Sequence, residues 1–209
     1  MQANLFDEKG NPAFSIEHDL IDATIREFPQ AFAPHQCEKI LNVLLQDTPW
    51  QQDSLWIAGK QIAVPRLQCW MGDRGSHYGY SGIRLVPAPW SEEVLAIREH
   101  VQQLTGKVFN SALLNYYRNG QDSVAWHADD EAELGPCPII ASVSFGAERP
   151  FQLRHKFRND LQNFKIRLRN GSLLLMGNTL QDKWLHQLPK VKGLTEPRIN
   201  LTFRTIRDS

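Results

Sequence analysis

The pattern of hydrophobic and polar positions predicts two helices in the first half of the chain. Residues 35–46 (HQCEKILNVLLQ) place their apolar side chains on one stripe at helical spacing. A second amphipathic helix is expected between Ser91, a candidate N-cap, and Gly106, a candidate helix stop. The buried stripe of this second helix consists of Val94, Ile97, Val101 and Leu104.

From about residue 108 onwards, short β-rich segments replace the helical pattern. Seven strand candidates are bounded by Gly, Pro, Asn or Asp: VFNSALLNYY, IIASVSFG, PFQLRHKF, FKIRLR, GSLLLMG, WLHQLP and RINLTFRTI. Strands do not alternate regularly with helices, and there is no GxGxxG motif, so a doubly wound nucleotide-binding fold is not expected. The pattern predicts an α+β, mainly β fold, in which a two-sheet sandwich or jelly roll carries helices on one side.

Composition favours one globular domain and an intracellular protein. The 209 residues are 42% hydrophobic, which suits one domain with a core. The three cysteines are widely spaced and lack a CxxC pair, so a reducing compartment is expected. The N-terminus does not resemble a secretory signal, and no apolar run is long enough for a membrane span. We expect a monomer without membrane contact, cytoplasmic if bacterial and nuclear if eukaryotic.

Charge is balanced overall but uneven along the chain. Lys plus Arg and Asp plus Glu both number 23. Between Arg149 and Arg169, however, seven basic residues face one acidic residue, Asp160, which gives this window a net charge of +6. This basic strip fits a partner held on one face of a neutral protein. A solvated strand pair with its loop explains the charge equally well.

The segment DSVAWHADDE (122–131) concentrates potential metal ligands directly behind Trp126. In a strand, His127 and Asp129 would project to the same face. His186 lies 57 positions beyond Asp129, on another strand candidate, and is the natural third ligand. Two histidines and one carboxylate are the ligand set of the non-heme Fe(II) oxygenases. Alone this pattern is weak, because such triples arise by chance and an acidic surface turn would look similar.

The last strand candidate adds a set of hydrogen-bond donors. One face of RINLTFR would present Arg198, Asn200, Thr202 and Arg204. A solvent-exposed strand would alternate in the same way, but two arginines beside Asn and Thr suit a carboxylate. Asn115 and Tyr117 are two positions apart in another strand candidate, so their side chains also share a face. We interpret the combination as a pocket for 2-oxoglutarate, whose keto acid end would chelate the metal while Arg holds the far carboxylate.

With these residues the chain resembles the AlkB-type 2-oxoglutarate/Fe(II) dioxygenases, which repair alkylated nucleic acid. The matching segments are PRLQCWMGD, YGYSG, NYYRNGQDSVAWHADDE, PIIASVSFGA, FQLRHK, GSLLLMG, WLHQLP and PRINLTFR. They follow the family order over roughly residues 55–206 and look closest to the branch of the DNA-repairing mammalian homologues. The resemblance implies an N-terminal extension (1–30), helices with a nucleotide-recognition lid (31–107) and a double-stranded β-helix core (108–209), in one catalytic domain.

The resemblance also implies roles for individual residues. The iron triad is His127, Asp129 and His186. The 2-oxoglutarate contacts are Asn115, Tyr117, Arg198, Thr202 and Arg204, with Asn200 assisting and Arg198 the best candidate for the distal carboxylate. The substrate contacts are Asp130, the lid residues Tyr78 and Tyr80, and Ala58 and Lys60 in the hairpin segment IAGK. One relative wedges an aromatic residue of this hairpin into duplex DNA; here Ala58 takes its place. Trp56 is an alternative wedge or a core residue.

The implied activity is oxidative demethylation of N1-methyladenine and N3-methylcytosine in DNA. The reaction would use Fe(II) as its cofactor, consume 2-oxoglutarate and O₂, and release formaldehyde and succinate. The modified base would have to leave the base stack to reach the iron. Phosphates are expected on Arg154, His155, Lys156 and Arg158 of the basic strip. Two alternatives remain open: the same chemistry on methylated RNA, a protein side chain or a small molecule, and a non-catalytic metal-binding jelly roll that binds nucleic acid.

Overall fold

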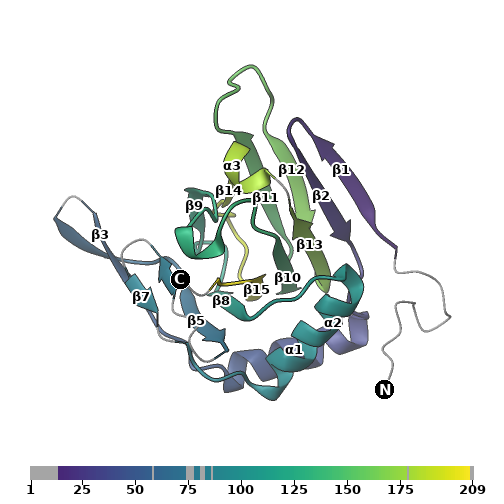
Figure 1. Ribbon diagram of the computed structural model, residues 1–209. Coiled ribbons are helices and arrows are strands. Elements are labelled where there is room, and N and C mark those ends of the chain that lie inside the picture. Colours follow the sequence, from purple (N-terminus) through teal and green to yellow (C-terminus); the bar gives the residue numbers. More distant parts are fainter. Residues whose placement is uncertain are drawn as a thin grey trace.

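Two facing antiparallel sheets form the body of the protein, with two helices outside the larger sheet (Figure 1). The computed structural model describes residues 14–207 except 58, 74–77, 81–82, 86 and 178. Helices α1 (Pro34–Asp47) and α2 (Glu92–Thr105) cover one face of the larger sheet. Among the described residues, no helix has the length and apolarity needed to cross a membrane.

The larger sheet has seven strands in the order β1-β2-β13-β10-β15-β8-β5. Their bounds are β1 Ile16–Leu20, β2 Ala23–Phe28, β13 Ser172–Met176, β10 Ile140–Gly146, β15 Arg198–Arg204, β8 Ser111–Tyr117 and β5 Leu67–Gly72. The smaller sheet has the order β12-β11-β14-β9. Its strands are β12 Phe164–Leu168, β11 Arg149–His155, β14 Trp184–Leu188 and β9 Val124–His127. The seven strand candidates of the second half and the expected two-sheet architecture are thereby confirmed.

Short elements complete the described part of the fold. Two separate hairpins consist of β3 (Ser54–Ile57) with β4 (Lys60–Ala63), and β6 (Tyr78–Tyr80) with β7 (Ile83–Leu85). A 3-10 turn, η1 (Ala132–Leu134), follows the HxD segment, and the short helix α3 (Leu180–Lys183) precedes β14. The β3–β4 hairpin projects from the body of the molecule (Figure 1).

Helix α2 begins and ends where its sequence indicates. The Ser91 hydroxyl accepts a hydrogen bond from the Val94 amide at 3.3 Å, which satisfies one free donor of the first turn. Glu92 and Glu93 place negative charge at the positive end of the helix dipole. Gly106 adopts φ 66°, a left-handed conformation that glycine reaches without a steric penalty. Both predicted helix boundaries are therefore confirmed.

Strand β15 separates the two hydrophobic cores. Its side chains Ile199, Leu201 and Phe203 belong to the core under α1 and α2. The opposite side chains, Arg198, Asn200, Thr202 and Arg204, line a pocket between the two sheets, and all four are buried. The polar face of this strand therefore points into the protein, which excludes the solvent-exposed interpretation and calls for a polar ligand.

The large sheet draws on segments assigned to other regions in the sequence analysis. Ile16–Leu20 and Ala23–Phe28, placed in an N-terminal extension, form β1 and β2, and β2 pairs with β13. Leu67–Gly72, placed in the lid region, forms the opposite edge strand β5 and pairs with β8. The reason is long-range pairing: β2 and β5 gain hydrogen bonds from β13 and β8, which are distant from them in the sequence.

Candidate active site

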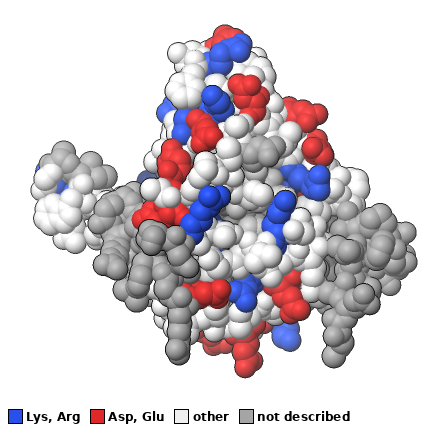
Figure 2. All heavy atoms as spheres, viewed as in Figure 1, with Lys and Arg blue, Asp and Glu red and all other residues white. Residues whose placement is uncertain are grey.

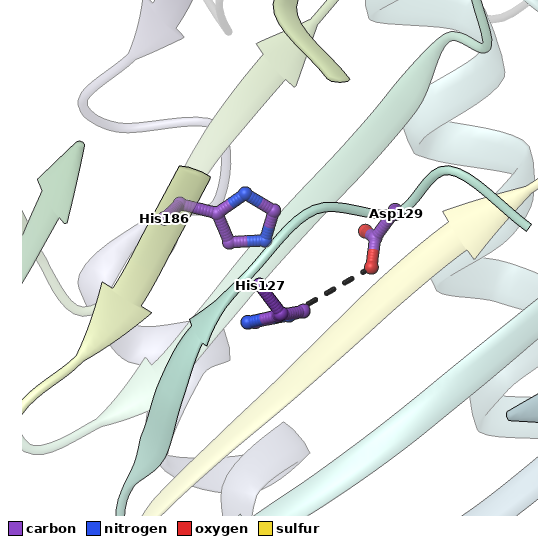
Figure 3. Close-up of side chains that lie close together, drawn as sticks. All are labelled: His127, Asp129 and His186. Carbon is purple, nitrogen blue, oxygen red and sulfur yellow. Dashed lines mark ion pairs between the residues drawn. The ribbon is translucent and has the colours of Figure 1, made fainter. Parts of the chain in front are cut away.

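Three potential metal ligands converge between the sheets. His127 is the last residue of β9, and His186 lies opposite it on β14. The ligand atoms of His127, Asp129 and His186 all lie within 4.8 Å of one another, and Figure 3 shows the three side chains pointing toward a common centre. Strand β9 ends before Asp129. The pair therefore does not share one regular strand, contrary to the expectation; Asp129 lies in the irregular segment that follows β9.

Hydrogen bonds hold the first two ligands in place. The His127 Nδ1 lies 2.8 Å from the Ala125 carbonyl, so Nδ1 carries the hydrogen and Nε2, 3.8 Å from Asp129 Oδ1, keeps its lone pair. The Asp129 amide donates to Gln181 Oε1 at 2.9 Å. Arg204 Nη2 donates to Asp129 Oδ1 at 2.9 Å. Such outer partners fix the orientation of a ligand before the metal binds.

The protonation states of the triad suit a divalent cation. Burial lowers the pKa of His186 to about 3, and burial also lowers the pKa of His127. Burial acts to raise the pKa of Asp129, but the charge of Arg204 and the two imidazoles outweigh it and lower this pKa to about 2. At neutral pH the site therefore offers two neutral imidazoles and one carboxylate. Because metal ligands must be deprotonated, this donor set fits Fe(II).

A buried pocket beside the triad contains every predicted 2-oxoglutarate contact. Its lining includes Asn115, Tyr117, Arg198, Asn200, Thr202 and Arg204. Arg198 is 2% exposed, donates to Ser144 Oγ at 2.9 Å and lies 5.2 Å from the centre of the Tyr117 ring. Its Nε is buried without a hydrogen-bond partner, and burial lowers the pKa of its guanidinium to about 10. A carboxylate at this end of the pocket would satisfy both the charge and the free N–H.

Comparison with known proteins identifies the family. A model of the 2OG-Fe(II) oxygenase superfamily matches residues 24–204. The mouse protein "DNA oxidative demethylase ALKBH2" is 39% identical over 189 residues, which cover 86% of this chain and 79% of that relative. The chain belongs to the AlkB family of 2OG-Fe(II) oxygenases. Fe(II) and 2-oxoglutarate are typical of this family. The donor set of the triad fits Fe(II), and the guanidinium-lined pocket fits 2-oxoglutarate.

Other relatives agree with this placement. Human "Alpha-ketoglutarate-dependent dioxygenase alkB homolog 3" is 42% identical over 179 residues, or 82% of this chain, and the match spans 62% of the human protein. A 2OG-Fe(II) oxygenase family oxidoreductase from Burkholderia pseudomallei has a TM-score of 0.59 at 15% identity, covering 88% of this chain and 86% of that one. OsALKBH1 has a TM-score of 0.54 at 15% identity, covering 91% and 100%. The structural likenesses show the fold, a double-stranded β-helix.

Further residues of this AlkB-family protein reach the site without a signal in the hydrophobic pattern. Arg66 is 4% exposed, lines the pocket and donates through Nε to Asn115 Oδ1 at 2.7 Å. Gln68 on β5 donates to the same oxygen at 3.1 Å. Gln181, fully buried on α3, holds the backbone of Asp129. Neither Arg66 nor Gln68 was singled out, although both lie in a segment quoted for the family resemblance.

Arg149 connects the segments that lead to the two histidines. It is 1% exposed and donates to the carbonyls of Asn119 at 3.3 Å, Asp122 at 2.9 Å and Pro189 at 2.7 Å. Asp122 precedes β9, and Pro189 follows β14. The guanidinium therefore joins the approach to His127 to the end of the His186 strand. Although Arg149 counts toward the basic strip in the sequence, its charge lies inside the protein.

The remaining basic strip is largely neutralised by acidic neighbours. Lys156 pairs with Asp130 at 3.0 Å and Arg158 with Asp160 at 2.7 Å. Basic and acidic side chains are interspersed on the face shown in Figure 2. His155 is buried, and its Nδ1 accepts the backbone N–H groups of Phe157 and Arg158, both at 3.1 Å. His155 therefore orders the loop and does not contribute a surface contact, contrary to the expectation of a phosphate ligand.

The predicted substrate residues have mixed outcomes. Asp130 directly follows the metal ligand Asp129, and its side chain is 57% exposed. Lys60 is exposed on β4. Trp56 is 74% exposed, so it is not a core residue. Ala58 and the side chains of Tyr78 and Tyr80 lie outside the described residues.

Proposed function

We propose that this protein is an Fe(II)- and 2-oxoglutarate-dependent dioxygenase that removes methyl groups from alkylated nucleobases. The observation that carries the proposal is the joint arrangement of a deprotonated His-Asp-His triad and the buried, incompletely paired guanidinium of Arg198. A structural metal site has no need for this guanidinium, which argues against a non-catalytic jelly roll. The name of the mouse relative, DNA oxidative demethylase, supports DNA as the substrate.

The residues have distinct tasks in this reaction. His127, Asp129 and His186 would hold Fe(II) on one side, and Arg198 would bind the distal carboxylate of 2-oxoglutarate. Arg204 keeps Asp129 oriented and ionised. When bound, Fe(II) supplies the activation of O₂ coupled to oxidative decarboxylation of 2-oxoglutarate. One oxygen atom enters succinate, CO₂ leaves, and the other oxygen leaves with the methyl carbon as formaldehyde, while the base nitrogen regains its ordinary valence.

Charge favours N1-methyladenine and N3-methylcytosine as the substrates. Methylation at these ring nitrogens gives a cationic base that cannot form its normal pair and is therefore less costly to extrude. The carboxylate of Asp130, next to the triad, is available for a cation because its pair with Lys156 is partly exposed. Exposed ion pairs of this kind contribute little stability and exchange partners readily. Asp130 would then bind the exocyclic side of the modified base.

The experiment is a substrate panel with two products measured in parallel. Succinate and formaldehyde are quantified with single-stranded DNA, duplex DNA and RNA oligonucleotides that carry N3-methylcytosine or N1-methyladenine. We expect stoichiometric formaldehyde and succinate from at least one DNA substrate. Asp129→Asn should abolish both products, because a neutral amide replaces the anionic ligand.

A matched control and a clear negative outcome complete this test. Asp160→Asn makes the same change at an exposed acid paired with Arg158, away from the triad, and should retain activity. Succinate formation without formaldehyde from any oligonucleotide would uphold the oxygenase chemistry and refute nucleobases as substrates. Formaldehyde from RNA alone would replace DNA by RNA as the substrate.

A further inference from the structure

An apolar trough adjoins the candidate active site. Its volume is 580 Å³, and it lies between the projecting β3–β4 hairpin and strand β9. The trough and the 2-oxoglutarate pocket share Arg66, Val124, His127 and Leu188 in their linings. Because one of these shared residues is a metal ligand, whatever occupies the trough lies next to the reacting centre.

The chemistry of the trough suits a planar, partly apolar group attached to an anion. Its apolar lining includes Leu55, Ile62, Pro65, Trp126, Leu188 and Pro189. Its charged lining residues are Arg66 and Lys190, and no Asp or Glu belongs to the described lining. A cavity with cations and without anions favours a negatively charged ligand.

The hairpin presents only one of its faces to the trough. Leu55 pairs with Ile62 across the two strands, and both line the cavity. Trp56 pairs with Gln61, and neither belongs to the lining. Neighbouring residues of a strand point to opposite faces, so the exposed Trp56 is directed away from the trough. The aromatic ring available to a ligand in the trough is therefore that of Trp126.

Trp126 provides an aromatic surface in the trough. It directly precedes the ligand His127 on β9, so the two side chains point to opposite faces of the strand, and Trp126 is half-buried and lines the trough. The guanidinium carbon of the exposed Arg154 lies over its ring, 4.6 Å from the centroid. An aromatic ring beside a cation is the combination on which proteins stack unpaired bases and hold their phosphates.

We propose that the trough binds the nucleotide next to the modified one, with its base stacked on Trp126 and its phosphate near Arg154 and Lys190. This inference rests on the proposed function, because a modified base at the triad brings its covalent neighbour to the mouth of the pocket. A base that stacks on Trp126 cannot remain stacked in a duplex. The subsite therefore selects a single-stranded or locally opened segment of nucleic acid.

Binding of an unmethylated single-stranded DNA pentanucleotide tests the subsite without any chemistry. Fluorescence anisotropy would be measured on protein loaded with Mn(II) and 2-oxoglutarate. Trp126→Leu keeps an apolar side chain but removes the ring, so the Kd should rise roughly 5- to 150-fold. Trp126→Phe retains a ring and should restore most of the affinity. Phe157→Ala removes an aromatic that is 69% exposed and is not part of the lining, and should leave the Kd unchanged.

A second readout separates this inference from the proposed function. In this readout, kcat/KM is measured for a methylated pentanucleotide and for the methylated mononucleotide. The ratio of the first value to the second should fall in Trp126→Leu by the same factor by which the Kd rises. Equal Kd values and equal ratios for wild type and Trp126→Leu would overturn the subsite while demethylation stands. Loss of binding in Trp126→Leu, with no turnover of either substrate by wild type, would uphold the subsite and refute the demethylase.

Discussion

His186 should make the metal-free protein sensitive to acid, and the size of this effect follows from its burial. The imidazole is 4% exposed, and burial, reinforced by His127, lowers its pKa from 6.5 to about 3. The folded protein therefore binds fewer protons at this residue than the unfolded chain does. The stability linked to neutral His186 is present above pH 6.5 and is lost as the pH falls toward 3.

The magnitude is large enough to measure. Between pH 7 and pH 4 the unfolded chain gains a proton at residue 186 and the folded protein does not. Full titration over about 2.5 pH units at about 1.4 kcal/mol per unit would cost about 3.5 kcal/mol. Incomplete titration near both ends of the range reduces the linked loss in the free energy of unfolding to about 3 kcal/mol. Many domains have a total stability of only about 5–15 kcal/mol, so this loss is substantial.

Urea unfolding in EDTA at both pH values would measure it. His186→Gln removes the titrating group, so wild type should lose about 3 kcal/mol more than this variant between pH 7 and pH 4. His35→Gln makes the same substitution at an exposed histidine and serves as the control. Equal losses in wild type and His186→Gln would show that His186 is not held neutral, and the reasoning from burial would fail.

The same protonation states predict how metal binding depends on pH. Because the His186 imidazole is already neutral, Mn(II) has no proton to displace from it between pH 7 and pH 5. Because the pKa of His127 is also lowered, the Mn(II) affinity should fall less steeply over this range than it would with ordinary imidazoles, as measured by metal-induced thermal stabilisation. An affinity that drops steeply below pH 6.5 would indicate ordinary, solvent-accessible imidazoles.

Three further predictions concern arginines and the basic strip. Arg198→Ala should raise the KM for 2-oxoglutarate about 10- to 100-fold, because charge-assisted hydrogen bonds are lost, and an unchanged KM would point to another anchor. Arg149→Met removes the guanidinium donor from three carbonyls, of which that of Asn119 keeps the Asp122 amide, and should lower the free energy of unfolding by about 3 kcal/mol. Arg167→Met, at a side chain that is 72% exposed, should change it by less than about 0.5 kcal/mol in urea titrations. Reversal of Lys156 and Arg158 to Glu should weaken DNA binding and reduce its salt dependence, and an unaffected slope in a salt titration would identify both as solvated surface.

Local patterns were sufficient to predict the two long helices and seven strands of the second half. The cap residues Ser91 and Gly106 mark the ends of α2 because capping depends on neighbouring backbone groups. The alternation along β15 indicated which side chains share a face because strand geometry has a period of two. It could not show that the polar face is buried, since an exposed strand has the same alternation. The second sheet, packed over Arg198 and Thr202, decides that.

The site was predictable only as far as its residues carry a spaced motif. His127 and Asp129 are two positions apart, and His186 and the arginines of the last strand lie on later strand candidates. The family resemblance supported their assignment to one site. Arg66, Gln181 and the Trp126 trough carry no comparable signal. Arg66 joins the site because the start of β5 lies against β8, and Gln181 because α3 lies against Asp129. The trough forms because the β3–β4 hairpin lies beside β9.

The sequence by itself determined the two long helices and seven strands of the second half, which of their faces are apolar and which side chains can bind a metal and a dicarboxylate. The tertiary structure alone decided that residues 16–28 join the large sheet, that the Arg149 charge is internal and that an aromatic trough opens beside the iron site. The physical reason is the range of the interactions. Capping and periodicity act within a few residues, whereas strand pairing and burial depend on which distant segments come into contact.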